Sequence, residues 1–218
     1  MKRRDFSVQL AASGLGLALA GPGTAHAQGA PVEGKNYIKL TTRAPLSLPG
    51  PDKKVEVVEF FGYYCPHCFA FESTLEAWVK KLPADVAFRR NPVAFSVPQQ
   101  ALQKAFYALE DMGQIDNMHR KLFVAIHQQN RRLNTDKEIA EFVSSQGVDM
   151  AKFRDAFNSF SVNSRASRAR QLSQDYKIDG VPTLGVQGRF YTTGSLTGSN
   201  DRMLQVVDHL IGLARRGA

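Results

Sequence analysis

The chain has 218 residues, which is long enough for one large domain or for a small domain that carries an insertion. Hydrophobic residues make up 43% and charged residues 22%, the proportions of a folded protein with a packed core. Two cysteines are too few for a disulfide framework that would hold the fold together. The net charge is +8, but the basic residues are interleaved with acidic ones, and no nucleic-acid-binding motif is present. We therefore expect no nucleic-acid partner.

The first 27 residues have the layout of a secretory signal peptide. A basic start at Lys2, Arg3 and Arg4 precedes a weakly apolar stretch at residues 6–20, and a small-x-small cleavage site ends at Ala27. The apolar stretch is too short to remain as a membrane anchor. We therefore expect export, with cleavage after Ala27, into a compartment where disulfides persist. The paired arginines leave both the twin-arginine route and general secretion open.

The next part of the chain predicts three strands and one helix. Prolines and Gly50 interrupt the lead-in before the first long apolar run. That run is rich in β-branched and aromatic residues, which indicates a buried strand, and Gly62 ends it. Pro83 ends the helix that follows, and Asn91-Pro92 breaks the next strand. We place these elements at residues 37–40 (edge strand), 55–61 (buried strand), 66–81 (helix) and 86–90 (strand).

From about Pro98 to Tyr176 the pattern is helical, because apolar residues recur at three- and four-residue steps. Thr135 with Glu138 predicts a capping box, and Asp149 predicts the N-cap of the following helix. A fifth helix, polar and rich in arginine, is expected at 163–176. The other four are marked by Leu102, Phe106 and Leu109; by Met118, Leu122, Val124 and Ile126; by Ile139, Phe142 and Val143; and by Phe153 and Phe157.

Strand character returns near the C-terminus. Leu184 and Val186 mark one short strand, and Gln187-Gly188 predicts a hairpin turn into a second strand. Ser199 or Asn200 then caps a last amphipathic helix, whose apolar side carries Met203, Leu204, Val207, Leu210 and Leu213. The order is strand–helix–strand, a helical insertion, and then hairpin–helix.

The sequence Cys65-Pro66-His67-Cys68 falls where the buried strand passes into a helix. A cysteine reacts as its thiolate, and the free N–H groups and dipole at a helix N-terminus favour that negative charge on Cys65. Pro66 suits the first helical position, and His67 can add a positive charge or a hydrogen-bond donor. Cys68, one turn into the helix, is expected to be the less exposed thiol that resolves a mixed disulfide. A stabilised thiolate favours the reduced protein, which makes the disulfide form a stronger oxidant.

Two other interpretations of the cysteine pair are weaker. A structural zinc site needs four ligands, and the sequence contains no second cysteine pair. A purely structural bridge between positions three apart closes a very small loop and constrains little of the unfolded chain. We therefore predict neither a metal nor a cofactor.

The run Glu59-Phe60-Phe61-Gly62-Tyr63-Tyr64-Cys65-Pro66-His67-Cys68, with Gly180-Val181-Pro182-Thr183 far downstream, resembles the DsbA family of periplasmic disulfide oxidoreductases. The resemblance covers essentially all of the exported chain. It implies an α/β thioredoxin-like fold with a helical domain inserted between the strand after the active-site helix and the cis-proline strand. The implied parts are a signal peptide (1–27), a first thioredoxin-like part with the active site (28–95), the inserted helical domain (96–176) and a second thioredoxin-like part (177–218).

The resemblance also implies roles for individual residues and partners. Val181-Pro182 would be a cis peptide bond facing the cysteines, and the backbone of Val181, Pro182 and Thr183 would pair with an extended substrate chain. Glu59 matches the buried acid of the family, which helps to move a proton when Cys68 attacks. The implied partners are reduced exported proteins and a DsbB-type quinone-linked membrane protein. We expect the protein to act in the periplasm as a monomer.

Other side chains have plainer interpretations. His119, His127 and His209 are predicted to be surface histidines, and Arg165, Arg168 and Arg170 a solvated helix face. Glu56 suggests that the buried strand tolerates an exposed acid, while Glu59 is expected to be partly buried. The leading function is a dithiol oxidase. A disulfide isomerase or reductase and a non-enzymatic chaperone remain alternatives.

Overall fold

The computed structural model describes residues 29–217, and the chain from Pro31 onward forms one compact unit. The predicted signal peptide lies outside the described residues. The strands are β1 (Ile38–Lys39), β2 (Val55–Phe61), β3 (Val86–Pro92), β4 (Thr183–Val186) and β5 (Phe190–Thr193). The helices are α1 (Pro66–Val79), α2 (Val97–Asp111), α3 (Ile115–His127), α4 (Asp136–Ser145), α5 (Met150–Asn158), α6 (Phe160–Asp175), α7 (Gly194–Thr197) and α8 (Asn200–Arg215).

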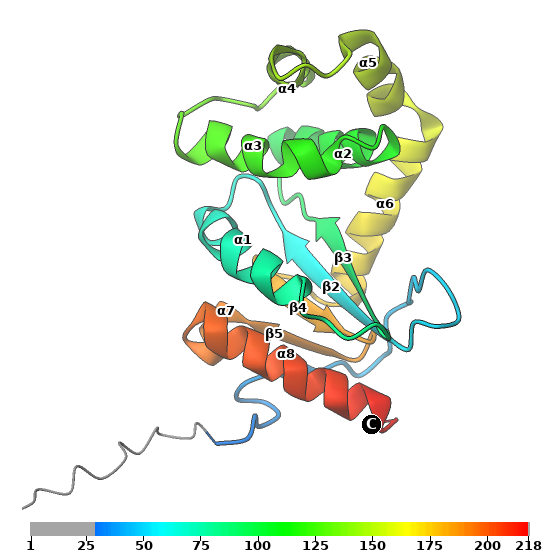
Figure 1. The fold of residues 1–218 in the computed structure, drawn as a ribbon, viewed down its shortest axis with the longest axis vertical. Coiled ribbons are helices and arrows are strands. Elements are labelled where there is room, and N and C mark those ends of the chain that lie inside the picture. The colour runs from blue at the N-terminus through cyan, green and yellow to red at the C-terminus, as the bar shows by residue number, and fades with distance from the viewer. Residues whose placement is uncertain (1–28, 218) are drawn as a thin grey trace, which may run out of the picture. The chain divides into compact units, whose positions relative to one another are not determined.

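The strands form one sheet in the order β1-β5-β4-β2-β3. β2 pairs in parallel with β3 and antiparallel with β4. Helix α1 connects β2 to β3, and helices α2 to α6 form the connection from β3 to β4 (Figure 1). This is a thioredoxin-like α/β fold with a helical insertion, so the predicted fold class and the place of the insertion are confirmed. No helix in the described part of the chain is long and apolar enough to cross a bilayer.

β2 is buried along its whole length because helices cover both faces of the sheet. Side chains of a strand alternate between its faces. Val55 and Val57 pack with α1 and α8, whereas Val58 and Phe60 pack with Leu172 near the end of α6. The same alternation places Glu59 on the face that α1 covers.

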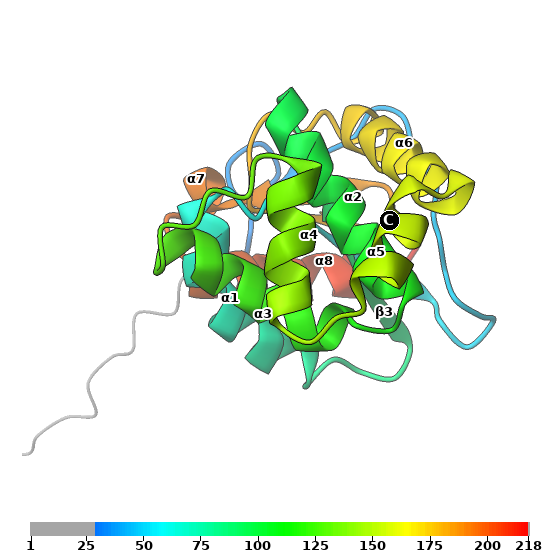
Figure 2. The ribbon, with the colours of Figure 1, turned by 90° about the horizontal axis from the view of Figure 1, so that it is seen from above.

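The C-terminal end of β2 connects the sheet to the helical insertion. Phe61, the last residue of β2, packs with Phe106 of α2 and Phe123 of α3 in a cluster that also contains both cysteines. Figures 1 and 2 show α2 and α3 lying beyond this end of the sheet, with α4 and α5 stacked on them. The cysteines therefore lie at the junction between the sheet and the insertion.

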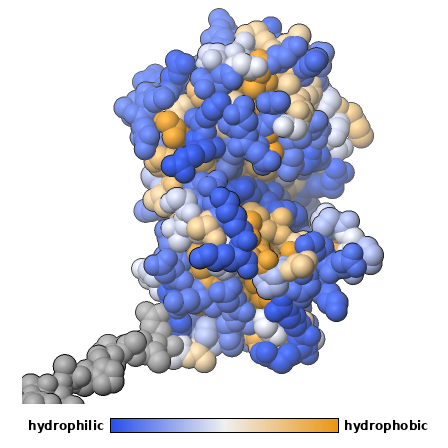
Figure 3. Space-filling model, in the orientation of Figure 1, coloured by the Kyte–Doolittle hydropathy of each residue, from blue (hydrophilic) through white to orange (hydrophobic). Residues whose placement is uncertain are grey.

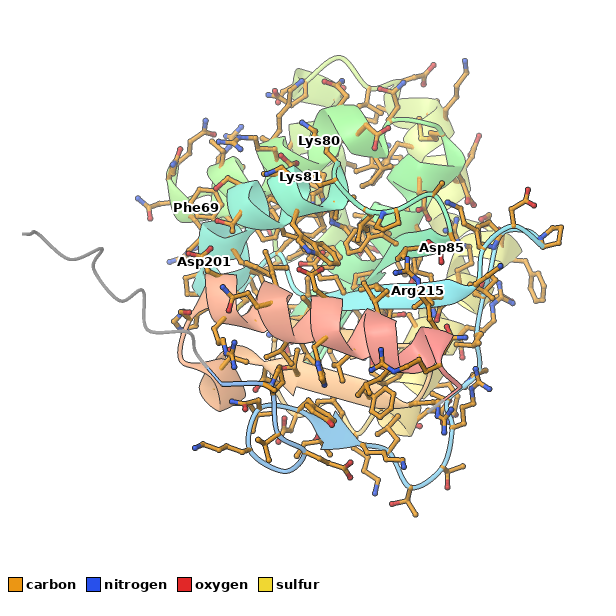
Figure 4. The ribbon with its side chains drawn as sticks, turned by 60° about the horizontal axis from the view of Figure 1, so that its bottom comes forward. Phe69, Lys80, Lys81, Asp85, Asp201 and Arg215 are labelled. Atoms are coloured by element: carbon orange, nitrogen blue, oxygen red, sulfur yellow. The ribbon has the colours of Figure 1, made fainter. Side chains whose placement is uncertain are left out.

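The helix caps that the sequence predicted are present. Thr135 and Glu138 form a reciprocal capping box at α4, Asp149 caps α5, and Ser199 caps α8. At its other end α8 is held by Arg215, which donates two hydrogen bonds to Asp85 at 2.6 and 2.9 Å (Figure 4). On the face seen in Figure 3, hydrophilic side chains predominate, with smaller apolar areas between them.

Several element boundaries differ from the predicted ones. β3 continues through Asn91 and Pro92. A proline is tolerated there because β3 lies at the edge of the sheet, so the missing N–H of Pro92 removes no hydrogen bond from the interior of the sheet. Helix α6 begins at Phe160, capped by Ser159, rather than at residue 163. The short helix α7 was not predicted.

Glu56 is also placed differently from the prediction. Its side chain is buried rather than exposed, and it accepts two hydrogen bonds from Arg89 of β3, at 2.9 and 3.2 Å. The paired guanidinium supplies the compensation that a buried carboxylate needs.

We predict that Thr135→Ala lowers the free energy of unfolding by about 1 kcal/mol, because it removes the oxygen that accepts from the Glu138 N–H at 3.2 Å. Urea unfolding followed by circular dichroism measures the change. The control is Ser144→Ala in the last turn of the same helix, which leaves the backbone hydrogen bonds of the C-cap unchanged and should change stability by less than about 0.5 kcal/mol. Equal effects of the two substitutions would contradict the role of the capping box.

Candidate active site

The two cysteines occupy the first turn of α1. After β2 the chain turns through Gly62, whose carbonyl oxygen accepts a hydrogen bond from the Cys65 N–H at 3.0 Å. Cys65 is the N-cap residue and Pro66 holds the first helical position, where a missing N–H leaves no bond unmade. The prediction that a helix begins at Cys65 is confirmed.

The start of the helix stabilises a thiolate at Cys65. The Cys65 Sγ accepts a hydrogen bond from the backbone N–H of Cys68 at 3.4 Å. The largest effect on the pKa of Cys65 is a hydrogen bond from the Cys68 thiol, which lowers the pKa, whereas burial raises it. The backbone N–H groups of Cys68 and His67 and the charge of His67 lower the pKa further. The resulting pKa is about 6 instead of 9.0, so Cys65 is mainly a thiolate at neutral pH.

Cys68 has the opposite character. Its side chain is 0% exposed, against 7% for Cys65, and both residues are free thiols in this structure. Burial raises the pKa of Cys68 far above its usual range, and the neighbouring Cys65 and Glu59 raise it further. The pair thus combines one sulfur that is stable as an anion with one that stays protonated, as thiol–disulfide exchange requires.

The turn before β4 faces the first cysteine. The Val181–Pro182 peptide bond is cis, and the Val181 carbonyl oxygen lies 3.3 Å from the Cys65 Sγ, within hydrogen-bond distance of a thiol. Thr183, the first residue of β4, donates from Oγ1 to the Gly180 carbonyl oxygen at 2.8 Å. The fold therefore brings the predicted Val181–Pro182–Thr183 segment to the cysteines across 116 residues of sequence.

Glu59 lies in a buried cluster of charged side chains. It is 0% exposed, and its Oε2 accepts a hydrogen bond at 3.0 Å from the Nε of Arg90, the residue opposite it on β3. Burial raises the pKa of Glu59 to about 8, opposed by the positive charge of Arg90 and supported by the negative charge of Glu72. The carboxyl group can therefore gain or lose a proton near neutral pH, close enough to Cys68 to affect that thiol electrostatically.

Three further side chains complete this cluster. Arg90 donates a second hydrogen bond, to the Oε1 of Glu72 on α1, at 2.5 Å. The His119 Nε2 on α3 lies 3.3 Å from the same oxygen, and the His119 Nδ1 lies 2.8 Å from the Tyr63 Oη. Although burial opposes ionisation, His119 and Arg90 lower the pKa of Glu72. We call Glu59, Tyr63, Glu72, Arg90 and His119 the buried charge cluster.

The remaining predicted site residues lie at the surface. Pro66 and His67 are exposed on the first turn of α1, where the charge of His67 reaches Cys65. Figure 4 shows Phe69, which directly follows Cys68, at the active-site end of α1, with Lys80 and Lys81 at the other end. Within residues 29–217, no group of three or more His, Cys, Asp or Glu side chains is arranged to hold a metal ion.

Comparison with known proteins places this site in a family. The family profile described as "DSBA-like thioredoxin domain" matches residues 56–210. The chain is 43% identical over 196 residues to the thiol:disulfide interchange protein DsbA of Burkholderia cepacia, covering 90% of this chain and 89% of that protein. It is 40% identical over 185 residues to the protein of the same name in Pseudomonas aeruginosa PAO1, with 85% and 86% covered. This chain belongs to the DSBA-like thioredoxin family.

Solved structures agree with this assignment. The crystal structure of Pseudomonas aeruginosa DsbA matches with a TM-score of 0.81 and 38% identity, over 86% of this chain and 96% of that one. The oxidoreductase NmDsbA1 from Neisseria meningitidis matches with a TM-score of 0.75 and 28% identity, over 85% and 95%. With the cysteine geometry, these likenesses identify this DSBA-like protein as a thiol–disulfide oxidoreductase.

Sequence reasoning missed most of the buried charge cluster of this DSBA-like protein. His119 was predicted to lie at the surface but is 5% exposed, and Arg90 and Glu72 were not singled out. Glu72 had a detectable signal, because it lies four residues after Cys68 and therefore shares a helix face with it. The position of Arg90 follows only from the register that pairs it with Glu59. His127 is half-buried too: its Nε2 lies 2.8 Å from the Tyr63 carbonyl oxygen, and its ring stacks on Phe69.

We predict that the reduced protein shows a thiolate absorbance transition with a midpoint near pH 6, because the Cys68 thiol and the N–H groups of the first helical turn stabilise the Cys65 anion. Ultraviolet absorbance measured against pH reports it. Cys65→Ser should abolish the transition. Cys68→Ser keeps a hydroxyl donor in place of the thiol and should leave the midpoint well below 9. A wild-type midpoint near the ordinary value of 9.0 would contradict this account of the site.

Proposed function

We propose that this oxidoreductase is a dithiol oxidase, which donates its Cys65–Cys68 disulfide to reduced exported proteins. The observation that carries the proposal is the position of Cys65 at the N-cap of α1, with its pKa lowered to about 6. Thiol–disulfide exchange favours expulsion of the sulfur that is most stable as an anion. The final step of disulfide donation expels Cys65, so the equilibrium runs towards a disulfide in the substrate.

The proposed reaction has two exchange steps. A substrate thiolate first attacks the Cys65 Sγ of the oxidised protein, forming a mixed disulfide, and the bond to Cys68 breaks with its electron pair on Cys68. A second substrate thiolate then attacks the substrate sulfur of that mixed disulfide. The substrate disulfide forms, and Cys65 leaves as a thiolate. The substrate is oxidised by two electrons, and the cysteine pair gains them.

Glu59 is proposed to supply the proton that Cys68 takes up in the first step. Cys68 is buried and poorly stable as an anion, so it must be protonated as it leaves. With a pKa of about 8, Glu59 carries a proton at neutral pH and can release it. In the reverse direction, when Cys68 attacks a mixed disulfide on Cys65, the ionised Glu59 accepts the proton of Cys68.

Val181, Pro182 and Thr183 are proposed to bind the substrate chain beside the reacting sulfur. The Val181 carbonyl oxygen lies 3.3 Å from the Cys65 Sγ, so a chain attached to that sulfur passes directly over this turn. An extended segment can pair with backbone groups of such a turn whatever its side chains are, which suits an enzyme of broad specificity. The fold supports this role by fixing Thr183 within β4, opposite Phe60 of β2.

Reoxidation by a DsbB-type quinone-linked membrane protein in the periplasm is the remaining part of the proposal, with this protein acting as a monomer. The signal-like residues 1–27 and the family likeness support export. Phe95 and Val97 are 52% and 76% exposed beyond the C-terminal end of β3, the same end of the sheet at which β2 leads to Cys65. They supply apolar surface on which a partner could dock.

We predict that the oxidised protein converts a reduced dithiol peptide to its disulfide, and that Cys65→Ser reduces this conversion to the uncatalysed rate. Cys68→Ser, mixed with the disulfide form of the peptide, should instead accumulate mixed disulfides, because the Cys65 thiolate attacks the peptide disulfide, one peptide sulfur leaves as a thiolate, and no second protein thiol is present to displace the peptide from Cys65. Peptide oxidation followed by mass spectrometry, with acid-quenched samples on non-reducing gels, measures both. Full activity of Cys65→Ser would contradict the assignment.

The same preparations separate the other two functions. Rapid reshuffling of a scrambled substrate by a dimeric protein would indicate an isomerase. A Cys65→Ala, Cys68→Ala double variant that still prevented aggregation of unfolded chains, with no oxidase activity in the wild type, would indicate a chaperone.

A further inference from the structure

His119 is the most enclosed of the histidines within residues 29–217, and each polar group it faces can exchange or balance a proton. Its ring lies between the Tyr63 hydroxyl, 2.8 Å from Nδ1, and the Glu72 carboxylate, 3.3 Å from Nε2. The rings of Phe61, Phe106 and Phe123 enclose it, with centroids 5.2 to 6.1 Å away. A histidine that only filled space here would not need two polar partners.

The buried charge cluster contains one more acid than it has fixed positive charges. Glu59 and Glu72 share a single guanidinium, that of Arg90. With both carboxyl groups ionised, one negative charge in the protein interior is uncompensated, so the cluster retains one additional proton near neutral pH. Glu59 is one place for that proton, since burial raises its pKa to about 8.

Unpaired atoms indicate that the cluster is built for more than one arrangement of this proton. The Oε1 of Glu59, the Oε2 of Glu72 and the Nε2 of His119 are buried without a hydrogen-bond partner. Native structures pair nearly all such atoms, and three exceptions in one cluster require an explanation. A proton shared among these groups supplies one, because it adds a hydrogen-bond donor to whichever group holds it.

The contacts of His119 suit both the neutral and the protonated ring. A neutral ring accepts from the Tyr63 hydroxyl at Nδ1 and keeps a hydrogen on Nε2, facing Glu72. A protonated ring donates from both nitrogens, to the Glu72 carboxylate and to the oxygen of the same Tyr63 hydroxyl, which rotates from donor to acceptor. The exchange reverses the donor and acceptor roles only at Nδ1, while Nε2 faces the Glu72 carboxylate in both states.

We propose that His119 is a second proton site of the buried charge cluster, protonated when Glu59 is ionised and neutral when Glu59 is protonated. The inference rests on the proposed role of Glu59 as proton partner of Cys68. When Cys68 attacks a mixed disulfide, its sulfur forms a bond to Cys65, the bond from Cys65 to the substrate sulfur breaks, and the substrate leaves as a thiolate. The proton of Cys68 passes to Glu59, which is free to accept it because His119 holds the additional proton. The ring of His119 then becomes neutral, and its proton is released to solvent, which balances the departure of the substrate as a thiolate.

The groups around His119 favour this exchange. Burial lowers the pKa of His119 and so does the charge of Arg90 from β3, whereas Glu72 and Glu76 from α1 raise it. Tyr63, from the turn after β2, stays a neutral hydroxyl because burial raises its pKa. While Glu59 is protonated, this balance leaves the ring neutral. Ionisation of Glu59 adds a second negative charge to the cluster and draws a proton onto the ring.

The first test is the titration of the His119 ring by NMR in the reduced wild-type protein and in Glu59→Gln. We expect a lower midpoint in Glu59→Gln, because position 59 then never carries the negative charge that favours the protonated ring. The control signal is that of His209 on α8, whose ring lies beside Tyr37, and it should respond to pH in the same way in both proteins. An unchanged His119 midpoint would overturn the inference, and this test needs no substitution at His119.

The second test replaces His119 with glutamine, which can still hydrogen-bond to Tyr63 and Glu72 but cannot carry the proton. The reduced protein is mixed with 5,5′-dithiobis(2-nitrobenzoate), so that Cys65 releases one thionitrobenzoate and Cys68 then releases a second. Stopped-flow absorbance records both releases against pH. In His119→Gln we expect the midpoint of the second release to rise by about half a pH unit or more, which is about threefold slower release at pH 7. The first release should keep its wild-type profile.

His127→Gln is the matched control. His127 lies on the same helix and also contacts Tyr63, because its Nε2 lies 2.8 Å from the Tyr63 carbonyl oxygen, but it contacts no carboxylate. It should leave the midpoint of the second release unchanged. A wild-type midpoint in His119→Gln would overturn the inference. Failure of the proposed function would give different results. If Glu59→Gln showed the second release at the wild-type midpoint, Glu59 would not be the proton partner of Cys68. If the protein failed to oxidise the peptide but released thionitrobenzoate normally, only the proposal that it acts as an oxidase would be wrong.

Discussion

Stabilisation of the Cys65 sulfur as an anion, by hydrogen bonds from the Cys68 thiol and from the backbone N–H of Cys68 across the first turn of α1, governs the chemistry of this protein. It exists because β2 ends at Phe61 and a short turn delivers Cys65 to the N-cap, with proline in the next position. A helix N-terminus offers N–H groups that have no partner within the helix, and an anion satisfies them. The packing of β2 between two layers of helices holds this geometry in place. The fold thereby makes one of two chemically identical side chains a stable anion.

The second sulfur depends on the opposite condition, exclusion of water. Cys68, Glu59, Glu72 and His119 are all 5% exposed or less, and they lie where the sheet meets the helical insertion. The insertion therefore contributes to the chemistry, because α3 supplies His119 and α2 and α3 supply aromatic rings that enclose the cluster. A buried thiol needs a local partner for its proton, and a buried acid needs compensation for its charge. The buried charge cluster supplies both the proton partner and the compensating charge.

The fold and the reacting residues were largely predictable from the sequence, because local patterns carry them. The apolar run of β2, interrupted only by Glu56 and Glu59, the capping box at α4 and the Cys-Pro-His-Cys motif are each recognised within a few residues. The extension of β3 to Pro92 was missed because it depends on β3 lying at a sheet edge. The partners of Glu59 were missed because Arg90 reaches it through strand register and His119 through the packing of α3, both of which are tertiary facts. Glu56 and His119 have polar side chains that the sequence alone places at the surface, whereas paired charges hold them inside.

The difference in unfolding free energy between the reduced and the oxidised protein, measured against pH, tests the central claim most directly. The Cys65 pKa of about 6 in the folded reduced protein lies below the ordinary value of 9.0, so this thiolate stabilises the reduced form fully above pH 9. The contribution declines as the pH falls and is lost below about 6, and the oxidised form has no thiolate to gain from. We predict that the reduced protein is the more stable one and that its advantage grows between pH 6 and 9. Two results would contradict the account. One is an oxidised protein that is the more stable form at every pH, as expected if the disulfide only restricted the unfolded chain. The other is a difference in stability that does not depend on pH.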